Sequence, residues 1–322
     1  MSQSLSDVPG RPVVGSRSIS LAGRPRRGEQ AIKVVLASFA GVSVLTTAAI
    51  VLSLVPPTVA FFRETASPLE FLTGRTWSAL FADPSFGVLP LLTATLLITV
   101  IAIAVALPVG LASAVYLSEY ASPRRRRLFK PAIEVLAGIP TVVYGFFALE
   151  FVAPQVLQRF WPGFLGDPPG TFSALAAGLV MGFMIVPTIA SLSEDALTAV
   201  PRSLRQGSAG LGATRMQTTV RVVVPAALSG IVAAVVLGVS RAIGETMIVL
   251  IAAGGTPRMS FDPTDGMQTM TGFIAQAGIG DLPTGSVGYR TIFAVGSLLF
   301  VLTFIMNAIS IRLVRRYQEV YE

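Results

Sequence analysis

The chain has 322 residues, of which 52% are hydrophobic and 13% charged, against the roughly 25% charge content of soluble domains. A mean hydropathy of +0.71 is too apolar for one soluble core of this length and indicates an integral membrane protein. The sequence holds no cysteine and no histidine. This excludes disulfides, thiol catalysis, Ser-His-Asp triads and the usual zinc sites, and no metal site or catalytic residue is expected.

The first 30 residues are rich in Ser, Gly, Pro and Arg and poor in apolar residues. Such a composition cannot form a core, so we expect residues 1–30 to be a disordered cytoplasmic tail. The apolar run that follows is too long for a signal peptide and lacks an evident cleavage site. The remaining residues, 31–318, are expected to form one transmembrane domain.

Six apolar runs are long enough to cross a hydrocarbon core, which takes about 20 helical residues. Four of them carry no charge: Val34–Phe62, Val88–Ser118, Thr171–Ser193 and Thr291–Ile311. Two carry charges, namely Pro131–Gln158 with two glutamates and Pro225–Gly254 with Arg241 and Glu245. The sequence therefore predicts an all-α, multi-pass membrane protein with six transmembrane helices in a bilayer.

The basic residues lie mainly on one side of the predicted membrane. Eighteen of the 24 Lys and Arg fall before the first span, in the second or fourth connection, or after the sixth span. Five fall on the other side, and Arg241 lies within a span. Because basic residues are retained in the cytoplasm, we expect both termini to be cytoplasmic. The net charge of +7 then reflects topology, and no nucleic-acid partner is expected.

The connections differ in character. Arg63–Gly87 is expected to be an outer loop with a short interfacial helix, and part of 255–289, Gln268–Gly278, is expected to dip back into the membrane as a re-entrant turn. On the cytoplasmic side, Glu119 and Glu134 flank the basic run that begins at Arg124, and we expect both to pair with it.

The long connection between the fourth and fifth spans, residues 194–225, is predicted to form two short helices at the cytoplasmic face. Pro201 or Ser203 can start the first helix and the Gly210/Gly212 pair can end it, with a second amphipathic stretch at Met216–Val224. Two interpretations are open on physical grounds. The loop either lies among lipid headgroups or docks a cytoplasmic partner through close backbone approach at its glycines.

The spacing within this loop matches a known motif: Glu-Ala-Ala, three residues, Gly, nine residues, Ile, any residue, Leu, Pro. Gln206-Gly207-Ser208 occupies the triplet, Gly212 follows after three residues, and Val222–Pro225 comes nine residues later. The segment resembles the coupling loop of permease subunits of bacterial ABC importers. Gln206 stands where the motif has its acidic residue, and a neutral amide can still donate and accept hydrogen bonds.

Three other stretches narrow the resemblance: Tyr116–Tyr120 before the basic run, Leu136–Phe147, and Ser240–Thr246. Over about residues 85–315 the chain is similar to the permease of bacterial phosphate-specific ABC importers, of the PstC type. The resemblance implies a type I importer permease in the bacterial inner membrane. It implies a second permease subunit of the PstA type, a cytoplasmic ATPase dimer, an extracytoplasmic phosphate-binding protein and inorganic phosphate as partners.

The resemblance also implies roles for particular residues. ATP is bound by the partner ATPase, and this chain binds no cofactor. The glycine-rich stretch of the loop lacks the lysine and the preceding strand of a nucleotide loop. The residues expected to couple the ATPase are Arg205, Gln206, Gly207, Ser208, Ala209, Gly210, Leu211, Gly212, Ala213 and Pro225.

Arg241 and Glu245 are charges inside the fifth span, where a central charge costs about 2.5–3.5 kcal/mol. In a continuous helix they lie one turn apart on one face, so they either form an internal ion pair or line the translocation path. The guanidinium fork fits phosphate oxygens, and Glu245 could hold the guanidinium or accept a proton from the anion.

The sequence disfavours two other functions. A secondary, ion-coupled anion transporter usually shows paired repeats with broken helices in both halves, and no second copy of the fifth-span pattern is evident. A membrane enzyme is disfavoured because the sequence lacks histidine and cysteine and has few carboxylates within its spans.

Overall fold

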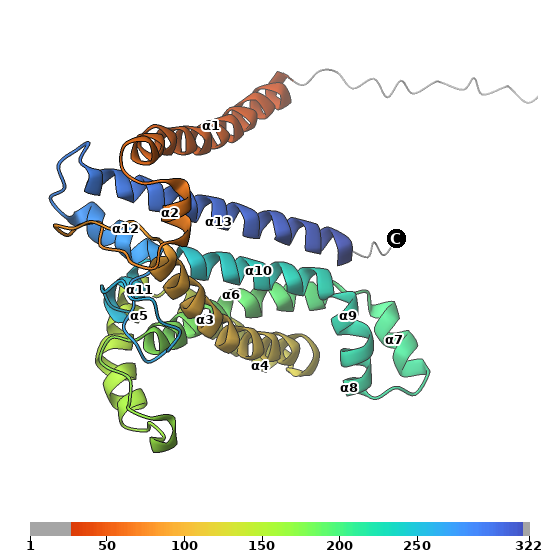
Figure 1. Cartoon of the computed structure of the whole chain (residues 1–322). Helices are drawn as coiled ribbons and strands as arrows, with labels where there is room; N and C mark the ends of the chain where they lie inside the picture. Colours follow the sequence, from red (N-terminus) through yellow and green to blue (C-terminus); the bar gives the residue numbers. More distant parts are fainter. Residues whose placement is uncertain (1–26, 318–322) are drawn as a thin grey trace, which may run out of the picture. The chain divides into compact units, whose positions relative to one another are not determined.

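The computed structural model describes residues 27–317, and within that range nearly every element is helical. The chain divides into two units between Val51 and Leu52, inside the first helix. In order, the elements (Figure 1) are α1 (Arg27–Glu64), α2 (Pro68–Thr73), α3 (Leu89–Val115), η1 (Tyr116–Tyr120), α4 (Pro123–Ala137), α5 (Thr141–Phe147), η2 (Ala148–Gln158), η3 (Gly163–Leu165), α6 (Ala174–Ala199), α7 (Arg202–Gly210), α8 (Arg215–Thr218), η4 (Thr219–Val223), α9 (Val224–Ala226), α10 (Leu228–Gly244), α11 (Met247–Ala252), α12 (Met270–Ile279) and α13 (Val287–Tyr317).

The predicted number of spans is confirmed. This holds for five helical runs of the described part, which are long and apolar enough to cross a membrane. The predicted fifth span, Pro225–Gly254, reaches that length only if its helix Leu228–Gly244 is counted together with Arg215–Ala226, from which it is bent by 69°. Of the tail expected over residues 1–30, residues 1–26 lie outside the described range, whereas Arg27–Gln30 already belong to α1. The first unit's described part, up to Val51, is an apolar helix whose side chains are nearly all exposed.

The third span is shorter than predicted. The run Pro131–Gln158 is not one helix, because Gly138–Pro140 separates α4 from α5 and η2, and the apolar span covers only Thr141–Gln158. Proline lacks the amide proton that a continuing helix needs and disfavours helical geometry in the residue before it. The Tyr144 hydroxyl donates to the Leu136 carbonyl at 2.8 Å and closes the corner. The basic run is therefore helical, with Ser122 as the N-cap of α4.

The fifth span is also interrupted. Within Pro225–Gly254 the helix α10 ends at Gly244, Glu245 adopts an extended backbone, and α11 starts at Met247. The Thr271 hydroxyl donates to the Glu245 carbonyl at 2.7 Å, so a side chain of α12 replaces one of the lost helical hydrogen bonds. Interrupted membrane helices are tolerated where neighbouring side chains satisfy the freed backbone groups in this way.

Helix α6 packs tightly against α3 because glycines lie at their contact. A Cβ atom on Gly178 would lie 2.7 Å from Ile101, and one on Gly182 would lie 2.9 Å from the Ala102 carbonyl oxygen. The two glycines are four residues apart and therefore share one face of α6, as in the small-residue motifs of membrane helix pairs. This contact fixes the two helices that carry the functional segments described below.

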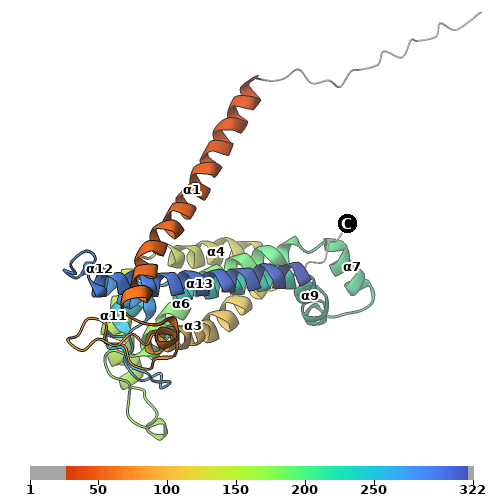
Figure 2. The ribbon, with the colours of Figure 1, turned by 45° about the horizontal axis from the view of Figure 1, so that its top comes forward.

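The two ends of the second unit are different. The short helices α7, α8 and α9 lie together at one end of the α6–α10 pair, here named the loop end, and α11 and α12 lie at the other (Figure 2). At that other end the connection before α3 is folded, with Trp77 packing edge-on against Phe273 of α12 at 4.9 Å between ring centroids. The stretch predicted to be re-entrant contains α12, a short apolar helix with several buried residues.

We expect Gly182→Val to destabilise the helical bundle by about 1–3 kcal/mol, because the added methyl groups must displace α3 backbone. The thermal midpoint of the purified protein in detergent measures the effect. Gly41→Val in α1 is the control, since a Cβ there meets nothing within 4 Å. Equal midpoints for both variants would contradict the role of Gly182 in packing.

Candidate functional site

The loop between α6 and α10 is a compact helical hairpin. As predicted, its first helix begins after Pro201 and ends near the glycine pair. Gly212 has a positive φ of 82°. Its amide donates to the backbone carbonyl of Ala209, and the Ala213 amide donates to the backbone carbonyl of Ser208. This is the Schellman arrangement, in which a left-handed glycine satisfies the last carbonyls of a helix. The turn therefore depends on glycine at position 212.

The second helix of the hairpin is fixed to the first. Thr214 and Gln217 form a reciprocal capping box at the start of α8. The hydroxyls of Ser208 and Thr218 lie 2.9 Å apart and join α7 to α8. Because the hairpin is held by its own hydrogen bonds, it can present a defined surface without a partner.

The expected coupling residues divide into an outer and an inner group. Leu211 is 91% exposed at the tip, and Met216 of α8 is 68% exposed. Ser208, Ala213 and Arg205 are half-buried. The other expected residues are exposed, namely Gln206, Gly207, Ala209, Gly210, Gly212 and Pro225. Exposed apolar side chains beside bare glycine backbone form a surface suited to a protein partner.

Arg205 points inward and joins the hairpin to the bundle. Its guanidinium donates to the carbonyls of Leu197 and Val200 at the end of α6, and to the Glu119 carboxylate at 2.9 Å. The carbonyls at a helix C-terminus lack helical partners and attract cations. One side chain of α7 thus holds both the end of α6 and the end of α3 through η1.

A second ionic cluster lies next to it. Glu194, 1% exposed near the end of α6, accepts hydrogen bonds from Arg126 and Lys130 of α4. The Glu194 hydrogen bond holds the pKa of Lys130 above its ordinary value of 10.5, against the opposing effect of desolvation. The stability that Lys130 contributes is present below 10.5 and is lost only as pH rises through this raised pKa.

Two expected ion pairs were assigned to the wrong partners. Glu119 pairs with Arg205 of the hairpin, not with the basic run, and Glu134 makes no ion pair among the described residues. The buried partner of the basic helix is Glu194. The sequence signal that could have identified it is the position of Glu194 at the end of an apolar span.

Arg241 and Glu245 do not form the internal ion pair considered above. Because α10 ends at Gly244, the two residues are not one turn apart on a continuous helix. The Glu245 carboxylate instead accepts from the amides of Met247 and Ile248 at 3.1 and 3.4 Å. It therefore caps the segment after the break.

The Arg241 guanidinium is left largely open. Arg241 is exposed in this chain, and among the described residues its one hydrogen bond goes to the Thr188 hydroxyl of α6 at 3.2 Å. Guanidinium carries five N–H donors, so four remain for a ligand or for another chain. A cation on an apolar span must face protein, water or cargo.

These features define a multi-span helical membrane protein with one exposed hairpin at an end of its bundle. Residues 106–319 match the family described as binding-protein-dependent transport system inner membrane component. The chain is 39% identical to the probable ABC transporter permease protein YqgH of Bacillus subtilis, over 76% of this chain and 77% of that protein. It is 33% identical to the phosphate transport system permease protein PstC of Mesorhizobium japonicum, over 75% and 76%.

A solved bacterial alginate ABC transporter in complex with its periplasmic protein contains a similar chain, with a TM-score of 0.62. The match covers 93% of this chain and all of that one at 13% identity, which shows the shared fold alone. The chain belongs to the family of binding-protein-dependent transport system inner membrane components. It is an inner-membrane permease subunit of an ABC transporter.

We expect that removing the two cations that bind Glu194 destabilises the protein more than removing the Glu194 carboxylate itself. Arg126→Met with Lys130→Met leaves a buried carboxylate without a partner, at a cost of about 3–5 kcal/mol. Glu194→Gln leaves two partly exposed cations that water can solvate, so this variant should lose less stability. Thermal midpoints of the purified variants measure both.

Arg258→Met is the control for that comparison, because its pair with Asp265 is more exposed and such pairs are worth about 1 kcal/mol or less. If Glu194→Gln lowered the thermal midpoint as much as the double variant does, the stability of the buried cluster would not depend on charge compensation.

Proposed function

We propose that this chain is one of two permease subunits of an ATP-driven importer of inorganic phosphate. The observation that carries the proposal is its relationship to phosphate permeases, 33% identity to the Mesorhizobium protein over three quarters of both chains. The exposed guanidinium of Arg241 on a membrane helix agrees with an anionic cargo. A PstA-type subunit supplies the other half of the path, and an extracytoplasmic phosphate-binding protein delivers the anion.

The loop end faces the cytoplasm in this proposal, together with both chain termini. Helices α7 and α8, which carry Arg202, Arg205 and Arg215, lie at that end (Figure 1), and Arg126 and Lys130 of α4 bind Glu194 near the end of α6 that leads to it. Five other arginines belong to the connections expected on the opposite side, namely Arg63, Arg75, Arg159, Arg258 and Arg290. This distribution follows the preference of basic residues for the cytoplasmic side.

The hairpin is the docking element for a cytoplasmic ATPase dimer, which binds the nucleotide. Leu211 and Met216 supply apolar contact, and exposed Gln206 supplies a neutral donor and acceptor where an acidic residue is usual. The chain itself is not an enzyme and holds no cofactor. Its glycine-rich stretch 207–212 ends a helix at Gly212 and does not begin one, so it does not have the geometry of a phosphate-cradling loop.

Arg205 transmits movement from the hairpin into the bundle. When the ATPases close on ATP, a displaced α7 pulls directly on the end of α6 and on Glu119. Helix α6 also carries Thr188, the partner of Arg241. Movement of α6 thus reaches the transit site along one helix, and the path alternates between outward-facing and inward-facing states.

Arg241 is a transit contact for the anion in this mechanism. Its free donors can bind phosphate oxygens as a fork, and Thr188 restricts the side chain to one side of α10. Glu245 keeps its role in the path by capping the helix break, which fixes the end of α10 close to Arg241.

We expect Arg241→Gln to abolish phosphate uptake by the assembled transporter while complex assembly is retained, because the amide cannot supply the cationic fork. Arg241→Lys should retain only part of the rate, since an ammonium presents a point charge. Uptake of labelled phosphate in proteoliposomes measures the rate, and co-purification measures assembly. Uptake close to the unmodified rate in Arg241→Gln would remove this residue from the path.

We expect Arg205→Gln to separate ATP hydrolysis from transport, with uptake falling at least tenfold while ATPase activity persists. Arg202→Gln, on the exposed side of the same helix, is the matched control and should leave the ratio of phosphate moved to ATP hydrolysed nearly unchanged. An unchanged ratio in Arg205→Gln would show that force enters the bundle elsewhere.

Reconstitution of the chain alone and with its partners tests the proposal as a whole. We expect uptake only with the second permease subunit, the ATPase, the binding protein and ATP. Uptake by the chain alone, driven by an ion gradient, would support the secondary transporter and overturn the importer.

A further inference from the structure

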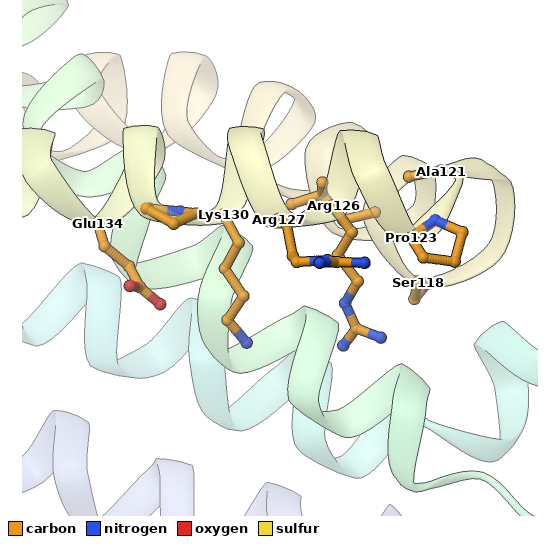
Figure 3. A pocket seen from close by; sticks show the side chains of 9 residues that line it. Ser118, Ala121, Pro123, Arg126, Arg127, Lys130 and Glu134 are labelled. Atoms are coloured by element: carbon orange, nitrogen blue, oxygen red, sulfur yellow. The ribbon is translucent and has the colours of Figure 1, made fainter.

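An open pocket lies beside α4, away from the hairpin surface and from Arg241. Its volume is about 590 Å³, and its lining includes Ser118, Arg126, Arg127, Lys130, Pro131 and Glu134. Figure 3 shows the side chains of Arg126, Lys130 and Glu134 extending from the same side of α4. The pocket belongs to the connection between two membrane spans, α3 and the α5–η2 segment.

The pocket is electropositive. Arg126 and Lys130 bind Glu194 but remain about one-third exposed, so part of each cation is available on the pocket side. Arg127 is exposed and makes no ion pair or hydrogen bond with the described residues. Helix α4 carries five cations and one carboxylate, Glu134, and the carboxylates of α6 that bind its cations are Glu194 and Asp195, so five positive charges against three negative ones leave a net charge of +2.

The neighbouring side of α4 is largely apolar and exposed, although Phe129 packs edge-on against Tyr116 and the helical spacing places Arg125 on the same side. Leu128, Phe129, Val135 and Leu136 are 69%, 44%, 68% and 42% exposed. Their positions recur at helical spacing, so they form one face, and Arg127, Pro131 and Glu134 lie along its flank. A helix with an apolar face and a basic flank, joined at both ends to membrane spans, is suited to lie in the plane of a bilayer surface.

We propose that this pocket binds the phosphate headgroup of an anionic phospholipid, with the acyl chains lying along the apolar face of α4. The unpaired Arg127 supplies the main charge contact, and Arg126, Lys130 and the Ser118 hydroxyl line the rest of the headgroup site. A free phosphate ion would use the cations but would gain nothing from the apolar face, so the combination selects a lipid.

Native mass spectrometry of the assembled transporter in detergent tests this. Phosphatidylglycerol and phosphatidylcholine are added in equal amounts, and the retained lipids are counted for the unmodified protein, Arg127→Gln and Arg312→Gln. Arg312 is exposed near the end of α13 and serves as a cation outside the pocket. We expect a phosphatidylglycerol preference that weakens about five-fold in Arg127→Gln and persists in Arg312→Gln.

A photoactivatable phosphatidylglycerol provides the second measurement. We expect its cross-links to map within residues 117–134. Equal loss in the two variants, or no preference over phosphatidylcholine, would overturn the proposal. So would displacement of the lipid by millimolar inorganic phosphate, or lipid cross-links that map to another subunit in place of residues 117–134. Because Arg127 makes no ion pair or hydrogen bond with the described residues, the thermal midpoint should not change, and reduced lipid retention cannot then come from unfolding.

Discussion

Close contact between α3 and α6 is the constraint on which the functional parts of this protein depend. Gly178 and Gly182 let the two backbones approach to a distance that any side chain would prevent. Helix α6 contacts each functional segment in turn. Thr188 contacts Arg241, Glu194 binds α4, and the carbonyls of Leu197 and Val200 accept from Arg205.

The carboxylates near the ends of the spans fix the local structure as well as neutralising cations. Glu194 and Glu119 fix two separate loops to the ends of α6 and α3. Glu245 satisfies backbone amides at a break within a membrane helix. In each case the low-dielectric surroundings make an unpaired group expensive, so the position of the charge determines the local geometry. Arg241 is different, because most of its donors are left without partners in this chain.

A permease operated by a separate ATPase needs a stiff connection between the docking surface and the path. In the proposed mechanism the hairpin supplies the surface, and its Schellman turn and capping box make it a single body. Arg205 makes the proposed connection, since one planar side chain spans α7, α6 and η1. The amphipathic helix α4 adds a lateral support, attached to α6 through Glu194 and, in our proposal, to the bilayer through Arg127.

The amino-acid sequence by itself determined the membrane class, the number of spans, the asymmetry of basic residues and the limits of α7. These depend on local composition, on hydrophobic length and on glycine and proline at particular positions, and each is readable without knowing the fold. The spacing around Gly212 even located the hairpin that docks a partner in the proposed mechanism.

Only the tertiary structure decided which side chains pair with which charged residues. Sequence proximity suggested that Glu119 and Glu134 pair with the basic run and that Arg241 and Glu245 lie one turn apart. Instead, residues distant in the chain, such as Arg205 and Glu119, meet because α3 and α6 pack side by side. Breaks at Gly138–Pro140 and Glu245 divided two apolar runs that hydropathy treats as continuous. Hydropathy reports only the transfer free energy of side chains, whereas a helix break depends on which neighbouring groups can satisfy the freed backbone.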